Sequence, residues 1–191
     1  STTVRMLVGL MEPTSGEVLW KGQSIFDDLP AYRRRLGYVP EEPFLYTHLT
    51  APEYLRLVGG LRGLEDAVLA QKIERFMKRF GLEDDQYSTL AAFSKGMRQK
   101  VQLASALMHN PELIVLDEPF SGLDVSAGLM LRSVIKSLAD EGRTILMSSH
   151  VIEVVEQMCT DVVILSDGKV VAHDRVDRLR KLQNDATLAV P

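Results

Sequence analysis

The chain has a single cysteine, a single tryptophan and no long hydrophobic run among its 191 residues. Because Cys159 has no second cysteine to pair with, an internal disulfide is excluded, which suits a reducing compartment. No apolar run approaches the roughly 18 residues of a membrane-spanning helix, and no signal peptide is recognisable. Positive charge is not in excess either, since 22 Lys and Arg face 26 Asp and Glu, a net charge of −4. A general attraction to nucleic acid or to an anionic membrane is therefore not expected.

What remains is the composition of an ordinary globular protein, with 46% hydrophobic and 25% charged residues. A chain of this length can bury a substantial core, so we expect one domain over residues 1–191. Strand-like segments alternate with helix-like ones, and the helical period dominates from 49 to 110. This pattern predicts an α/β fold, a mostly parallel sheet flanked by helices, with an inserted α-helical subdomain over 49–110.

The most informative segment is Leu113-Ile-Val-Leu-Asp117-Glu118-Pro119. Its apolar run predicts a strand buried on both faces. Carboxylates at the end of such a strand need a metal, a hydrogen-bond network or solvent, because burying an uncompensated charge is costly. Ligands of open parallel sheets bind at the carboxyl edge, so Asp117 and Glu118 are candidate site residues. Asp is also common in turns, and a simple turn is the alternative interpretation.

A second candidate precedes this strand, in Phe93-Ser94-Lys95-Gly96-Met97-Arg98-Gln99-Lys100. The segment predicts a helix that begins after a Ser94 cap. The free N–H groups and positive dipole end of such a helix suit a phosphate, Gly96 allows close backbone approach and Lys95 adds a positive charge. A capped surface helix without a ligand is the alternative.

A third candidate is His150, which follows the strand predicted over 143–148. If this strand is parallel to the acidic one, His150 falls at the same sheet edge as Asp117 and Glu118. A lone histidine at a strand end is more often structural, but a position at the same sheet edge as two carboxylates favours a functional role.

Five segments, taken in order and spacing, resemble the nucleotide-binding subunit of an ABC transporter. Residues 113–118 resemble the Walker B strand with its catalytic glutamate, and residues 93–100 resemble the signature loop. Residues 121–124 resemble the D-loop, His150 the switch histidine, and residues 37–42 the loop that normally offers a glutamine. The resemblance implies a P-loop NTPase-like fold.

The first residues, Ser1-Thr2-Thr3, resemble the end of the phosphate-binding motif G-x-x-x-x-G-K-[ST] and the residues after it. We therefore expect the chain to begin inside this Walker A motif, without its glycines and lysine. Ser1 would be the magnesium-binding hydroxyl, unless it is merely where the fragment begins. Without most of the phosphate loop, the chain alone is expected to be inactive.

The resemblance implies a head-to-tail dimer that holds two ATP molecules with Mg²⁺. The catalytic residues would be Glu118, which polarises the attacking water, and His150, which senses the γ-phosphate. Nucleotide and the opposite half of the dimer would be bound by Ser1, Thr2, Ser94, Lys95, Gly96 and Asp124. The metal would be held by Ser1, Glu41 and Asp117.

Three positions depart from the pattern of the family. Glu41 stands where the family usually has glutamine, which adds a charge to the loop that couples the site to a partner. In the signature loop, Lys95 replaces a common glycine and Met97 a common glutamine. This variant resembles exporter-type subunits that work with a separately encoded permease.

The expected function is an ATP-binding and hydrolysing subunit that powers transport through a partner permease. Its partners would be that permease and a second nucleotide-binding domain, identical or different, with no nucleic acid. It would be cytoplasmic, held at the inner face of the membrane by the permease. The alternatives are a soluble ABC-type ATPase of DNA repair or translation, and a non-catalytic regulatory subunit that binds nucleotide.

Overall fold

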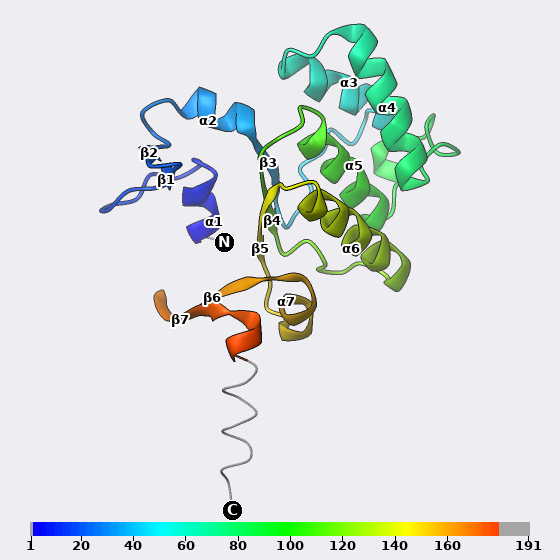
Figure 1. Ribbon diagram of the computed structural model, residues 1–191. Helices are drawn as coiled ribbons and strands as arrows, with labels where there is room; N and C mark the ends of the chain where they lie inside the picture. The colour runs from blue at the N-terminus through cyan, green and yellow to red at the C-terminus, as the bar shows by residue number, and fades with distance from the viewer. Residues whose placement is uncertain (1, 180–191) are drawn as a thin grey trace, which may run out of the picture. The chain divides into compact units, whose positions relative to one another are not determined.

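The computed structural model describes residues 2–179 as two compact units, which divide between Ser148 and Ser149. The prediction of a single domain with a helical insert stays a prediction. The second unit contains α7 (Ile152–Met158), β6 (Asp161–Ser166) and β7 (Lys169–Arg175). The first unit contains α1 (Thr2–Leu7), β1 (Leu19–Trp20), β2 (Gln23–Ser24), α2 (Leu29–Arg35), β3 (Leu36–Val39), α3 (Ala51–Leu61), α4 (Asp66–Phe80), the 3₁₀ turn η1 (Leu90–Ala92), α5 (Lys95–Leu107), β4 (Leu113–Asp117), α6 (Val125–Asp140) and β5 (Thr144–Ser148) (Figure 1).

The centre of the first unit is a parallel sheet of three strands in the order β3-β4-β5. Leu36 pairs with Leu113 at one end of the β3–β4 ladder, and Asp117 pairs with Ser148 at the other end of the β4–β5 ladder. The parallel α/β arrangement predicted from the sequence is confirmed. All three strands therefore end at the same edge, where Asp117 lies.

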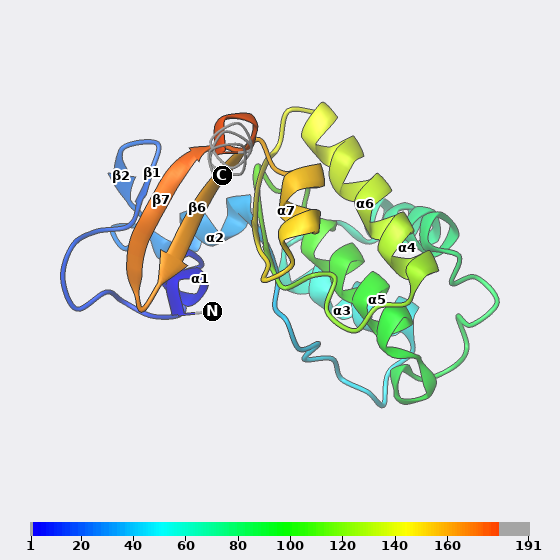
Figure 2. The same cartoon turned by 90° about the horizontal axis from the view of Figure 1, so that it is seen from below.

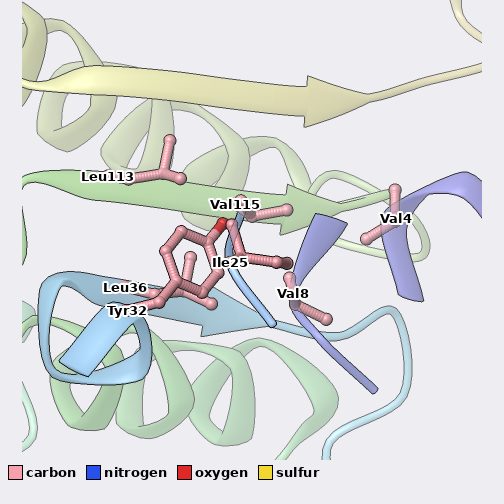
Figure 3. Close-up of a cluster of buried hydrophobic side chains, with 7 residues drawn as sticks. All are labelled: Val4, Val8, Ile25, Tyr32, Leu36, Leu113 and Val115. Carbon is pink, nitrogen blue, oxygen red and sulfur yellow. The ribbon is translucent and has the colours of Figure 1, made fainter. Parts of the chain in front are cut away.

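One face of this sheet is covered by α1 and α2. Leu113 and Val115 of β4 point to this face and form a buried cluster with Val4 of α1, with Val8 just after α1, and with Tyr32 of α2 (Figure 3). Tyr32 is also fixed by polar contact, because its hydroxyl donates to the carbonyl of Leu7 at 2.7 Å. This packing fixes α1 against the strand that carries Asp117.

The other face of the sheet is covered by α5. A Cβ placed on Gly37 of β3 would lie 2.6 Å from the carbonyl oxygen of Ala106 and 2.9 Å from the ring of Pro111. Ile114 and Leu116, which alternate with the residues of the α1 face, are 0% and 1% exposed. The strand β4 is thus buried on both faces, as its uninterrupted apolar run predicts.

The helices of the 49–110 segment begin and end largely where local signals predict. Thr50 and Glu53 form a complete capping box before α3, and Gly81 ends α4 in the left-handed conformation at φ 60°. The pair Gly59-Gly60 is a local signal for a helix end, but α3 continues to Leu61. Gly59 instead allows α3 and α4 to pack closely, since a Cβ there would collide with Leu69 of α4.

The second unit is a short helix followed by an antiparallel hairpin. Strands β6 and β7 lie side by side, with Ser166 paired to Lys169 across the turn Asp167-Gly168, a dipeptide typical of tight hairpins (Figure 2). Cys159 directly follows α7 and is half-buried, and this burial raises the pKa of its thiol. Between residues 2 and 179, no helix combines the length and the apolar character needed to cross a bilayer.

The contact at Gly37 gives a test of the packing between β3 and α5. Gly37→Ala is expected to destabilise the protein by about 1–3 kcal/mol, because the new methyl meets backbone atoms that cannot rotate away. Gly128→Ala in α6 is the matched control, since a Cβ there meets nothing within 4 Å and should stabilise by up to about 1 kcal/mol. Urea unfolding measures both. Equal stability of the two variants would contradict the packing described.

A half-buried histidine connects the end of α5 to the sheet. Nε2 of His109 donates to the carbonyl of Leu36 at 3.0 Å, and Nδ1 has no hydrogen-bond partner among the described residues. Burial lowers the pKa of His109 to about 4, and the positive charge of Arg62 contributes. The neutral form is therefore the one that the fold accommodates.

This lowered pKa predicts a loss of stability in mild acid. Because an unfolded histidine has a pKa of about 6.5, its contribution is complete above that pH and is lost as the pH falls towards 4. We expect the free energy of unfolding to fall by about 1 kcal/mol between pH 7 and 5, after discounting for solvent screening of this half-buried group. His109→Asn should flatten this slope in urea unfolding, and the exposed His48→Asn should not. An unchanged slope in His109→Asn would refute the assignment.

Candidate active site

Asp117 is the last residue of β4 and is only 4% exposed. The hydroxyl of Ser148, its partner at the end of β5, donates to Oδ1 of Asp117 at 2.6 Å. The same hydroxyl accepts a hydrogen bond from the backbone N–H of Glu118 at 2.9 Å. One serine therefore connects both candidate carboxylate residues, and the buried carboxylate has a hydrogen-bond donor, as burial requires.

Glu118 has an unusual backbone for a residue with a side chain. Its φ of 47° lies in the left-handed region, which glycine occupies far more readily. The turn continues in a hydrogen bond from the N–H of Ser121 to the carbonyl of Glu118 at 3.1 Å. Because such backbone strain persists where the surrounding structure enforces it, Glu118 is a candidate functional residue on its geometry alone.

The start of α1 belongs to the same region as the end of β4. Burial raises the pKa of Tyr38 on β3, the negative charge of Asp117 raises it further, and the positive charge of Arg5 on α1 lowers it. Figure 3 shows Val4 beyond Val115 in the direction in which β4 runs. The helix that begins at Thr2, an exposed residue, therefore faces the edge where β4 ends. The candidate Ser1 lies outside the described residues.

The third predicted metal ligand, Glu41, is exposed in a bend two residues after β3. Since β3 is parallel to β4, Glu41 follows the same edge as Asp117. Within residues 2–179, no three His, Cys or acidic side chains gather into a ready-made metal site. The residues fit a magnesium ion of the kind held by one or two carboxylates together with phosphates, because the Ser148 hydrogen bond engages only one oxygen of Asp117.

The predicted phosphate-binding helix start is confirmed as a helix start. Ser94 caps α5, with its hydroxyl accepting from the N–H of Met97 at 3.2 Å. Gly96 is buried, and a Cβ there would lie 3.3 Å from the Cβ of Ala127 and 3.8 Å from Oδ2 of Asp124. The beginning of α5 therefore packs against the beginning of α6, which brings the predicted signature and D-loop residues together.

Lys95 lies along this junction. A Cβ placed on Gly122, whose φ is +67°, would be 2.9 Å from Nζ of Lys95. The side chain that the sequence offers as a phosphate ligand thus rests against the D-loop of its own chain. Sequence analysis treated the two segments separately, and no local signal indicates that they meet.

His150 is exposed and stands two residues after the end of β5. The prediction for His150 requires that β5 be parallel to β4, and β5 is parallel to β4. The residue itself belongs to the second unit.

A cavity in the first unit lies away from these residues. It has a volume of about 280 Å³ and is lined by residues that include Trp20, Asp28, Tyr32 and Arg35. None of the predicted site residues lines it. The candidate site is therefore defined by its carboxylates and by a capped helix start, and not by this cavity.

Comparison with known proteins gives one consistent family. The family model described as ABC transporter matches residues 1–121. The ABC transporter ATP-binding protein all4389 of Nostoc sp. is 39% identical over 186 residues, which cover 96% of this chain and 55% of that protein. The chain thus spans little more than half the length of this relative.

Two solved structures share the fold over nearly the whole chain. The structure of an ATP binding subunit of an ABC transporter aligns with a TM-score of 0.85 and 37% identity, covering 96% of this chain and 76% of that one. The dimeric structure of the ATP-binding cassette MJ0796, in a post-hydrolysis state with ADP and Pi, aligns with a TM-score of 0.81 and 26% identity. It covers 92% of this chain and 79% of that one. The predicted P-loop NTPase-like fold is confirmed.

The hydrogen bond of Asp124 allows the contribution of its helix cap to stability to be measured separately from that of its charge. Oδ1 of Asp124 accepts from the N–H of Ala127 at 2.8 Å and caps α6. Asp124→Ala should therefore cost about 1 kcal/mol in thermal or urea unfolding, whereas Asp124→Asn keeps a capping oxygen and should stay within about 0.5 kcal/mol. Equal losses in both variants would show that the charge, and not the cap, stabilises this loop.

Proposed function

This chain belongs to the ABC transporter family, and we propose that it binds and hydrolyses ATP to power transport through a membrane permease. The observation that carries the proposal is the pair Asp117 and Glu118 at the carboxyl edge of a parallel sheet, both held by Ser148. Ligands of such sheets bind at this edge. Asp117 is buried and suits the role of metal ligand. Glu118 is half-buried with a strained backbone and suits the role of activating water.

In the proposed reaction, Glu118 polarises the water that attacks the γ-phosphate. Its strained backbone supports this role, because such conformations concentrate at sites where a side chain must be aimed. Asp117 holds magnesium, directly or through the water around it, together with Ser1 and Glu41. Magnesium, when bound, neutralises the charge on the phosphates during phosphoryl transfer. The buried position of Asp117 and the place of Glu41 after β3 support these assignments.

The helix start at Ser94, Lys95 and Gly96 binds the γ-phosphate of the nucleotide that the other cassette of a dimer holds. A capped helix of thirteen residues with a glycine in its first turn supports anion binding of this kind. Asp124 connects the two sites across the dimer, and its nearness to Gly96 supports that link. His150 senses the γ-phosphate, and Thr2 contributes to the nucleotide site from the start of α1.

The partners of this function are a second nucleotide-binding domain and a separate permease, which holds the chain at the cytoplasmic face of the membrane. The loop after β3 supports a docking role, because Phe44 and Tyr46 are 82% and 58% exposed. Exposed aromatic side chains of this kind are typical of contact surfaces. The variant signature with Lys95 and Met97 supports an exporter-type system.

The assignment of Glu118 is tested by Glu118→Gln in the intact protein. This change removes the charge and keeps the size, so hydrolysis should fall about 100- to 10,000-fold, as expected for loss of a general base. ATP binding and ATP-dependent dimerisation should persist. Phosphate release measures hydrolysis, equilibrium dialysis measures ATP binding, and gel filtration measures dimerisation.

Glu112→Gln is the matched control. Glu112 precedes β4 at the opposite end of the strand and is an exposed partner of Lys21 at 2.6 Å. Its replacement should leave hydrolysis within about twofold, because exposed ion pairs contribute little. Normal turnover in Glu118→Gln, with the control also normal, would refute the role of Glu118.

A further inference from the structure

We propose that Ser148 is a positioning residue for the hydrolytic carboxylates, which neither its position in the sequence nor the family resemblance singles out. The inference rests on the proposed function, because it assigns Ser148 to the reaction of Asp117 and Glu118. Ser148 ends β5, and its register with Asp117 places the two residues opposite each other at the sheet edge.

The Ser148 hydroxyl is a donor to one of these residues and an acceptor for the other. It donates its proton to Oδ1 of Asp117 at 2.6 Å, a length typical of a hydrogen bond to a charged acceptor. It accepts the backbone N–H of Glu118 at 2.9 Å. A hydroxyl has only one proton to donate, so the direction of both bonds is fixed.

For Asp117, this bond selects one orientation of a carboxylate that is 4% exposed. Loss of the donor would leave a buried oxygen without its partner, which is costly and allows the side chain to rotate. One oxygen of Asp117 is held by Ser148, and the carboxylate thereby presents a fixed geometry to a metal. Hydrogen-bond partners of metal ligands usually change metal affinity or activity about 10- to 100-fold when removed.

For Glu118, the bond stabilises a backbone that is otherwise unfavourable. The left-handed φ of 47° turns the chain sharply where β4 ends, and the N–H of Glu118 is anchored to Ser148 at that turn. Without this anchor, the strained residue can relax towards ordinary backbone angles. The position of the Glu118 carboxylate therefore depends on a hydroxyl of the neighbouring strand.

The test compares Ser148→Ala and Ser148→Thr in the intact protein. Ser148→Ala should lower kcat about 10- to 100-fold and raise the magnesium concentration for half-maximal activity, with the KM for ATP within about threefold. Ser148→Thr keeps the hydroxyl and should restore most of the activity. Ser105→Ala is the control for general destabilisation, because its buried hydroxyl donates to the carbonyl of Gln102 at 2.8 Å and interacts with Tyr54, and not with the two carboxylates.

A second readout needs no nucleotide. Amide hydrogen exchange at Glu118, followed by NMR, should accelerate at least about tenfold in Ser148→Ala, because its N–H loses its acceptor. The amide of Leu116, which belongs to β4, should be protected as in the wild type. Ser148→Thr and Ser105→Ala should leave both amides unchanged.

The outcomes separate this inference from the function on which it rests. Wild-type hydrolysis together with unchanged kcat and unchanged Glu118 exchange in Ser148→Ala overturns the inference alone. Equal losses of kcat in Ser148→Ala and Ser105→Ala also overturn it, because they indicate only destabilisation. Absence of hydrolysis in the intact wild-type protein overturns the proposed function, whatever the exchange of Glu118.

Discussion

The structure of the first unit depends on the burial of β4 on both faces. Val115 packs against α1 on one side, and Ile114 is fully buried on the side of α5. This burial removes water from Asp117, the residue that ends the strand, so the carboxylate must find its hydrogen-bond donor within the protein. The donor comes from Ser148, which the parallel register of β5 places opposite Asp117. Hydrophobic packing and the chemistry of the site are therefore coupled through one strand.

Close backbone packing extends this coupling to the candidate phosphate-binding helix. Gly37 allows α5 to lie directly on β3, and Gly96 allows the start of α5 to lie against the start of α6. Both contacts use glycines with ordinary backbone angles, so the requirement is space and not conformational freedom. The loop that follows Glu118 leads into α6, whose cap Asp124 lies beside Gly96. The acidic strand and the capped helix are thus arranged by two small residues as well as by the sheet.

The sequence predicts the features of this protein that depend on neighbouring residues. The buried strand at 113–117, the Ser94 cap and the Thr50 capping box are local patterns, and the structure has all three. The pair Gly59-Gly60 is a local signal for a helix end that α3 does not follow, because the role of Gly59 is tertiary: it makes room for Leu69 on another helix. Ser148 escaped prediction for the same reason, since a strand register that joins residues 31 positions apart leaves no local signal.

The backbone at Glu118 explains why this position is informative about function. A glycine would adopt the observed φ of 47° without strain, and the turn after β4 needs no side chain to form. The chain instead has a glutamate there and fixes its N–H with a hydroxyl from the next strand. Folding alone would favour the glycine, because a non-glycine residue in this conformation costs of order 1–3 kcal/mol. The strain at Glu118 therefore indicates a requirement for its carboxylate, and the proposed role of Glu118 in hydrolysis would impose such a requirement.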